Sequence, residues 1–114
     1  MPNTRPGLKF DDNGICGACL WAEEKKKIDW EGRNKQLEEL CKKHRKSDGS
    51  YDCVVPGSGG KDSFYASHIL KTKYKMHPLT VTWAPAIYTD WGLRNFHRWI
   101  DAGHDNYLNT PNGK

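Results

Sequence analysis

The sequence lacks any long apolar run. No apolar segment among its 114 residues approaches the roughly 20 that a membrane-spanning helix needs, so a membrane partner is not expected. The opening residues, Met1-Pro2-Asn3-Thr4-Arg5, lead into no apolar segment, and we therefore expect no secretory signal. Only four cysteines are present and their spacing is irregular. Together these absences favour a reduced, cytoplasmic protein over a disulfide framework.

The composition also lacks the bias of a disordered chain. Hydrophobic residues make up 36% of the sequence and include five Trp and five Tyr, which is enough for the modest core of one small domain. The net charge of +4 comes mainly from two clusters, Lys25-Lys26-Lys27 and Lys42, Lys43, Arg45 and Lys46. Solvated helix faces explain these clusters better than a nucleic-acid surface does, so nucleic acid is not an expected partner.

Turn residues and apolar periodicity divide the chain into three parts. Residues 1–28 are predicted to be irregular and to carry a knuckle, Cys16-Gly17-Ala18-Cys19. A helix is predicted over residues 29–48, with Asp29 as its N-cap. Its apolar side chains share one face because they recur at helical spacing; they are Trp30, Leu37, Leu40 and Cys41, with His44 beside them.

Residues 49–114 alternate between strand and helix patterns. Strands are predicted over residues 51–56, 79–83 and 106–109. Helices are predicted over residues 62–74 and from Thr89 or Asp90 onward; the second presents Leu93, Phe96 and Ile100 inward. This order predicts an α/β fold, an open parallel sheet with helices on both faces. Because the chain stops at Asn112-Gly113-Lys114, soon after the last strand, we expect the sheet to be incomplete and the natural protein to continue further.

The most informative motif is Ser58-Gly59-Gly60-Lys61-Asp62-Ser63, between the first predicted strand and the helix after it. Glycines let the backbone turn sharply and bring its N–H groups close to an anion. A helix N-terminus adds unpaired N–H donors and partial positive charge. Hydroxyls of Ser58 and Ser63, the Lys61 cation and the Asp62 carboxylate, which can hold magnesium, complete a phosphate site. The Walker A pattern is excluded, since Val55 and Asp62 stand where it requires Gly and Ser or Thr.

This loop resembles the signature of the ATP-pyrophosphatase (PP-loop) superfamily, whose fold is adenine nucleotide alpha hydrolase-like. The resemblance implies that Ser58, Gly59, Gly60, Lys61, Asp62 and Ser63 bind the pyrophosphate of ATP and its Mg²⁺, with Lys61 and Asp62 as catalytic residues. It also places Trp83 and Ala84 at the adenine site. Residues 49–114 would then be the first part of the ATP-binding domain.

Further stretches resemble the N-acetyl sugar amidotransferases within that superfamily. They are Arg5-Pro6-Gly7-Leu8, Gly14-Ile15-Cys16, Glu23 to Trp30, Tyr51-Asp52-Cys53, Val81 to Pro85 and Asn109 to Lys114. Gly57 departs from the pattern, because relatives often carry a small apolar residue there. The resemblance implies an ATP-dependent enzyme that forms AMP and pyrophosphate and converts an N-acetyl sugar to an acetamidino sugar in bacterial surface-glycan synthesis. A partner glutaminase subunit would supply ammonia.

Two other functions remain open at this stage. A tRNA sulfur-transfer enzyme of the same superfamily would share both the loop and a cysteine knuckle. A truncated, catalytically silent ATP-binding module would share the loop alone. Pyrophosphate release that depends on the sugar, on tRNA or on neither separates the three.

Cys16 and Cys19 are candidate Zn²⁺ ligands, since thiolates at this spacing can bind one ion. Free surface thiols are the alternative. A redox pair is disfavoured, because no strand is predicted before the knuckle and no helix is predicted to start there. Cys41 and Cys53 lie on an apolar helix face and in a buried strand, where packing is the expected role.

Overall fold

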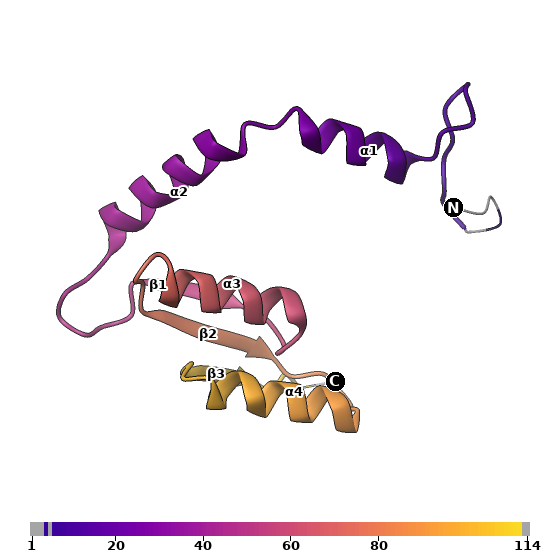
Figure 1. The fold of residues 1–114 in the computed structure, drawn as a ribbon. Helices are drawn as coiled ribbons and strands as arrows, with labels where there is room; N and C mark the ends of the chain where they lie inside the picture. The colour runs from indigo at the N-terminus through magenta and orange to yellow at the C-terminus, as the bar shows by residue number, and fades with distance from the viewer. Residues whose placement is uncertain (1–3, 5, 113–114) are drawn as a thin grey trace. The chain divides into compact units, whose positions relative to one another are not determined.

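The computed structural model describes residue 4 and residues 6–112 (Figure 1). Arg5, Gly113 and Lys114, which belong to the family-like stretches, lie outside the described residues. The chain divides into two compact units, Met1–Gln36 and Leu37–Lys114, and the division falls inside helix α2, Trp30–His44. Within the described part of the chain, no helix is both long enough and apolar enough to cross a membrane.

The first unit contains a helix that the sequence did not predict. Helix α1 spans Gly17–Lys26, inside the segment expected to be irregular. None of its side chains is buried, so it lacks the apolar stripe by which sequence patterns reveal helices. Local effects stabilise this helix instead. Most of its residues favour the helical conformation, and Lys26 and Glu23 form an exposed ion pair at 2.7 Å. The predicted cap of α2 is confirmed, because Asp29 Oδ1 accepts a hydrogen bond from the Gly32 amide at 2.8 Å.

The second unit is an α/β fold built on an open, three-stranded parallel sheet, as the alternation predicted. Its strands are β1 (Cys53–Pro56), β2 (Pro78–Trp83) and β3 (Asn106–Asn109), in the spatial order β1-β2-β3. Helix α3 (Lys61–Thr72) connects β1 to β2, and helix α4 (Asp90–Asp101) connects β2 to β3. The register aligns Val55 with Thr80 and Thr80 with Asn106.

The prediction of helices on both faces of the sheet is wrong for this unit, because α3 and α4 pack on the same face. Trp99 of α4 donates its indole N–H to the Ser67 hydroxyl of α3 at 2.8 Å, and both side chains are buried. Val55, Thr80 and Thr82 point to this covered side and are buried. Right-handed crossovers that add each strand on the same side of the last one place every connecting helix on one face.

Helix α4 begins where expected but buries a different set of side chains. Thr89 is the N-cap, and its hydroxyl accepts from the Gly92 amide at 3.1 Å. Phe96 is buried as predicted, whereas Leu93 and Ile100 are exposed and Trp99 is fully buried. Trp99 lies one turn after Phe96, and its larger ring fills the space between the two helices.

A small apolar core holds the end of α2 in the second unit. Cys41, Tyr74 and Met76 are buried together, with Ile69 and Leu70 packed against them. The Arg45 guanidinium donates to the carbonyl of Tyr74 just after α2 ends. Cys41 therefore has the packing role predicted for it.

Candidate functional site

The loop Gly57–Gly60 leaves the carboxyl end of β1 and enters α3. The register brings Pro56 beside Val81, and Trp83 beside Asn109, so the carboxyl ends of all three strands meet at one edge. The Gly57 amide donates to the carbonyl of Val81 at 2.9 Å and fastens the start of the loop to β2. The loop thus occupies the edge at which ligands of open α/β sheets bind.

The backbone amides of residues 58–63 have no acceptor among the described residues of the chain. The bonded amides on either side are those of Gly57 and of Phe64, which donates to the carbonyl of Gly60 at 3.0 Å. The N-cap of α3 is Gly60, whose lack of a side chain leaves the first helical amides uncapped. Buried helix ends normally find partners, and amides left open at a helix N-terminus form an anion site.

The glycines of the loop differ in what the fold requires of them. Gly59 has φ +80°, and a Cβ there would lie 2.7 Å from the Phe96 Cα, so the backbone of α4 packs directly on it. A Cβ on Gly57 would lie 2.2 Å from the Ser63 Cβ, which explains its glycine by packing. Gly60 has φ −68°, and a Cβ there would meet only the Ser58 hydroxyl, at 3.9 Å. The fold alone therefore does not explain Gly60.

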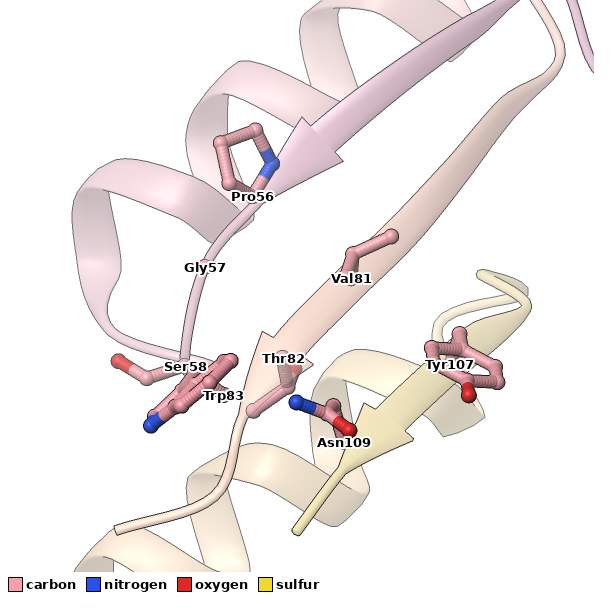
Figure 2. Close-up of a pocket in the computed structure, with 8 residues that line it drawn as sticks. All are labelled: Pro56, Gly57, Ser58, Val81, Thr82, Trp83, Tyr107 and Asn109. Atoms are coloured by element: carbon pink, nitrogen blue, oxygen red, sulfur yellow. The ribbon is translucent and has the colours of Figure 1, made fainter. Parts of the chain in front are cut away.

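Two hollows adjoin at the loop and share Pro56, Gly57 and Ser58. One, of about 590 Å³, is lined further by residues of the motif and its helix: Gly60, Lys61, Asp62, Ser63 and Ala66. The other, of about 610 Å³, extends across the strand ends and is lined by Val81, Thr82, Trp83, Tyr107 and Asn109 (Figure 2). Each is within the range of about 300–1,000 Å³ usual for small-molecule sites.

The structure brings most of the predicted site residues to these hollows. Trp83 lines the second hollow and is 68% exposed, so its ring is available to a ligand. Ala84 does not line it; Ala84 is buried and its amide donates to the carbonyl of Asn109 at 2.9 Å. The Ser63 hydroxyl, expected to be a free donor, donates to the Gly60 carbonyl at 3.0 Å and offers only its lone pairs.

Three further residues were missed by the sequence analysis. Tyr107 and Asn109 line the hollow at the strand ends, and their place at the end of the third predicted strand could have identified them. Arg98 shares a smaller hollow of about 230 Å³ with Lys61 and Gly59 on the α4 side of the loop. A second cation near the loop adds to its attraction for an anion. Nothing in the sequence spacing indicated that Arg98 would approach the loop.

The cysteine knuckle places Cys16 Sγ and Cys19 Sγ 3.4 Å apart. Cys16 is the N-cap of α1, so a helix does begin at the knuckle, contrary to expectation, and that argument against a redox pair falls. Hydrogen bonds from the amide and thiol of Cys19 lower the pKa of Cys16. The hydrogen bond to Cys16 and the charge of Cys16 raise the pKa of Cys19. Of the two thiols, Cys16 therefore loses its proton more readily than Cys19.

The other two cysteines are unsuited to chemistry. Cys41 is buried in the apolar core, and its burial raises the pKa of its thiol. Burial, followed by the neighbouring Asp52, raises the pKa of Cys53 to about 11. Both thiols therefore stay protonated at neutral pH, in agreement with a packing role.

Comparison with known proteins gives a partial match. No family model matches the chain. Over 78 residues, the chain is 36% identical to an uncharacterized protein of Methanocaldococcus jannaschii. The match covers 68% of this chain and 28% of that protein, so the chain spans little more than a quarter of its relative's length. The similarity establishes a relationship and carries no activity with it.

Proposed function

We propose that this chain binds ATP through Ser58–Ser63, as the front of a PP-loop domain with the adenine nucleotide alpha hydrolase-like fold. The pyrophosphate would occupy the hollow beside the motif, with Lys61 neutralising its charge. The adenosine part would extend into the adjoining hollow, against the exposed ring of Trp83. Asp62 would hold the Mg²⁺ that accompanies ATP and offsets its negative charge.

The observation that carries this proposal is the run of six amides, residues 58–63, at the carboxyl edge of the sheet, for which the described part of the chain supplies no acceptor. Amides left open in this way cost free energy unless water or a ligand accepts from them. Gly60 supports the same conclusion, because a Cβ atom at this position would not collide with the protein. Packing therefore does not require glycine there. A ligand that approaches the backbone closely accounts for both facts.

The proposed reaction is the conversion of an N-acetyl sugar to an acetamidino sugar. The acetamido oxygen would attack the α-phosphorus of ATP, the bond to the β-phosphate oxygen would break, and pyrophosphate would leave. Ammonia from a glutaminase partner would add to the activated carbon, AMP would leave with the oxygen, and loss of a proton would give the amidine. Adenylation is needed because an amide oxygen is otherwise a poor leaving group. This chain's part is to bind and orient the triphosphate for in-line attack.

Calorimetric titration with MgATP tests the binding step. Wild-type protein should bind, while Asp62→Ala and Lys61→Ala should lose at least tenfold in affinity with unchanged circular dichroism. Asp101→Ala, which removes an exposed carboxylate at the far end of α4, is the matched control and should bind as wild type does. Equal affinity in all four proteins would refute the assignment of the loop.

Pyrophosphate release tests the reaction. Release that requires both an N-acetyl sugar and ammonia supports the amidotransferase. Release that requires tRNA would replace it with sulfur transfer. MgATP binding without release under either condition would leave a nucleotide-binding module and remove the sugar chemistry.

A further inference from the structure

A small hollow lies on the α4 side of the loop, in addition to the two larger hollows. Its volume is about 230 Å³, below the roughly 300 Å³ at which sites for whole small molecules begin, so it fits one group of a larger ligand. Lys61, the first residue of α3, lines both this hollow and the one beside the motif, so both lie at the N-terminus of that helix. The other lining residues are Gly59, Phe64, Asn95 and Arg98.

The charged side chains that line this hollow are both cations. Lys61 and Arg98 are exposed, and no carboxylate lines the hollow with them. Among residues 4 and 6–112, neither cation forms an ion pair. Asn95, one turn before Arg98, adds a side-chain amide that can donate. Because two cations beside one small space repel each other until an anion lies between them, the hollow is suited to an anion with more than one negative charge.

Packing fixes the position of Arg98 beside the loop. The backbone of α4 lies directly on Gly59, where a Cβ atom would come within 2.7 Å of the Phe96 Cα. One turn further along α4, the Trp99 indole donates to the Ser67 hydroxyl of α3 at 2.8 Å. Arg98 stands between Phe96 and Trp99, which are both buried, so its backbone has a fixed place relative to the loop.

The proposed reaction requires the site to distinguish ATP from ADP. Both nucleotides carry a β-phosphate, but cleavage beside the α-phosphorus releases pyrophosphate from ATP and only phosphate from ADP. Amides that bind the β-phosphate alone would admit either nucleotide. Contact with the γ-phosphate is what selects ATP, and a guanidinium suits this role because it can donate two parallel hydrogen bonds to phosphate oxygens.

We propose that Arg98, together with Lys61, binds the γ-phosphate of ATP and makes the site selective for a triphosphate. This inference rests on the proposed function, because the amides of residues 58–63 must hold the β-phosphate for the next phosphate to reach the hollow. Lys61, which lines both hollows, is placed to contact both phosphates. Arg98 binds and positions the pyrophosphate group, and no bond to Arg98 forms or breaks.

The test is calorimetric titration with MgATP and with MgADP. Wild-type protein should bind MgATP at least tenfold more tightly than MgADP. Arg98→Gln should bind MgATP at least about tenfold more weakly, the loss usual for a hydrogen bond between charged groups, and should bind MgADP as wild type does. Arg98→Lys, which keeps the charge, should retain part of the preference.

Arg94→Gln is the matched control for this test. Arg94 is an exposed cation one turn before Arg98 on α4, stacks over the Trp91 ring at 5.2 Å and does not line the hollow. This variant should keep both wild-type affinities.

Two kinds of result would contradict the inference. A wild-type preference for MgATP in Arg98→Gln, equal weakening of both nucleotides, or equal affinity of wild-type protein for both would overturn it and leave the nucleotide site in place. Binding of neither nucleotide by wild-type protein would overturn the proposed function, and this inference with it.

Discussion

At the scale of single residues, two neighbouring glycines of one loop differ in how tightly they are packed. Gly59 lies against the backbone of α4 with a positive φ, so the packing of two elements depends on it. Gly60, the next residue, has an ordinary φ and free space around its Cβ position. The sequence shows only two adjacent glycines, and the structure separates a glycine needed for folding from one available to a ligand.

We predict opposite outcomes for alanine at these two positions. Gly59→Ala should lose about 2–4 kcal/mol of unfolding free energy, because it adds a strained φ to a collision with the Phe96 backbone. Gly60→Ala should cost at most about 1 kcal/mol, the usual difference between glycine and alanine at an N-cap, but bind MgATP more weakly. Urea unfolding and calorimetry measure the two effects. Similar losses of stability in both variants would contradict the distinction.

His104 gives the second unit a pH dependence. It is buried, with Nε2 3.5 Å from the Ser67 hydroxyl, and its burial, followed by the positive charges of Lys71 and His68, lowers its pKa. The unfolded chain therefore binds a proton more readily than the folded one. Stability should be complete above the ordinary histidine pKa of 6.5 and fall as the pH decreases below it toward the lowered folded-state value.

The measurement is the free energy of unfolding in urea between pH 7.5 and 5. His104→Gln should flatten the decline below pH 6.5, whereas His97→Gln, at an exposed position of α4, should leave it as in wild type. A wild-type slope in the His104 variant would show that other groups cause the acid sensitivity.

At the scale of elements, helices and strands that bury side chains could be predicted from the sequence, whereas a helix that buries none could not. Strands β1, β2 and β3 and helix α3 carry apolar patterns bounded by Gly and Pro, and they form where predicted. Helix α1 buries nothing, so no periodic signal marks it. In α4 the cap and the start were predictable, but the choice of Trp99 over Leu93 and Ile100 depends on which side of the helix meets α3. Spacing along one helix does not contain that information.

A buried hydrogen bond joins α3 to α4, from the Trp99 indole to the Ser67 hydroxyl. Ser67→Ala should cost about 1–3 kcal/mol, because the indole N–H of Trp99 would stay buried without its acceptor. Trp99→Phe removes the donor as well, so the double variant should lose less stability than the sum of the two single variants. Thermal or urea unfolding of the two single variants and the double variant measures the coupling. Strictly additive losses would show that the hydrogen bond does not join the helices.

At the scale of the whole molecule, the sheet is covered on one face. The other face carries large exposed side chains, with Val54 61%, Trp83 68% and Tyr107 61% exposed. The hollow at the strand ends opens on this side (Figure 2). Alternating strand and helix patterns predicted a parallel sheet, but the order of its strands, and thus the single covered face, depends on pairings between distant residues.

The candidate site, like the sheet, could be predicted from the sequence only in part. The motif, its place between β1 and α3 and the position of Trp83 follow from local sequence and the rule for strand ends. The contributions of Arg98, Tyr107 and Asn109 require the register of β3 and the approach of α4, which are tertiary facts. Ala84 was placed by resemblance, and its amide is instead used within the sheet.

The central claim is that the amides of residues 58–63 bind a pyrophosphate group. Amide NMR of isotope-labelled protein, titrated with magnesium pyrophosphate, tests it most directly. We predict saturable downfield shifts of these amides, with little change for amides already bonded within α4 or β2, and loss of the shifts in Asp62→Ala. Pyrophosphate that leaves those resonances unmoved, or that shifts the lysine-rich part of α2 instead, would contradict the account.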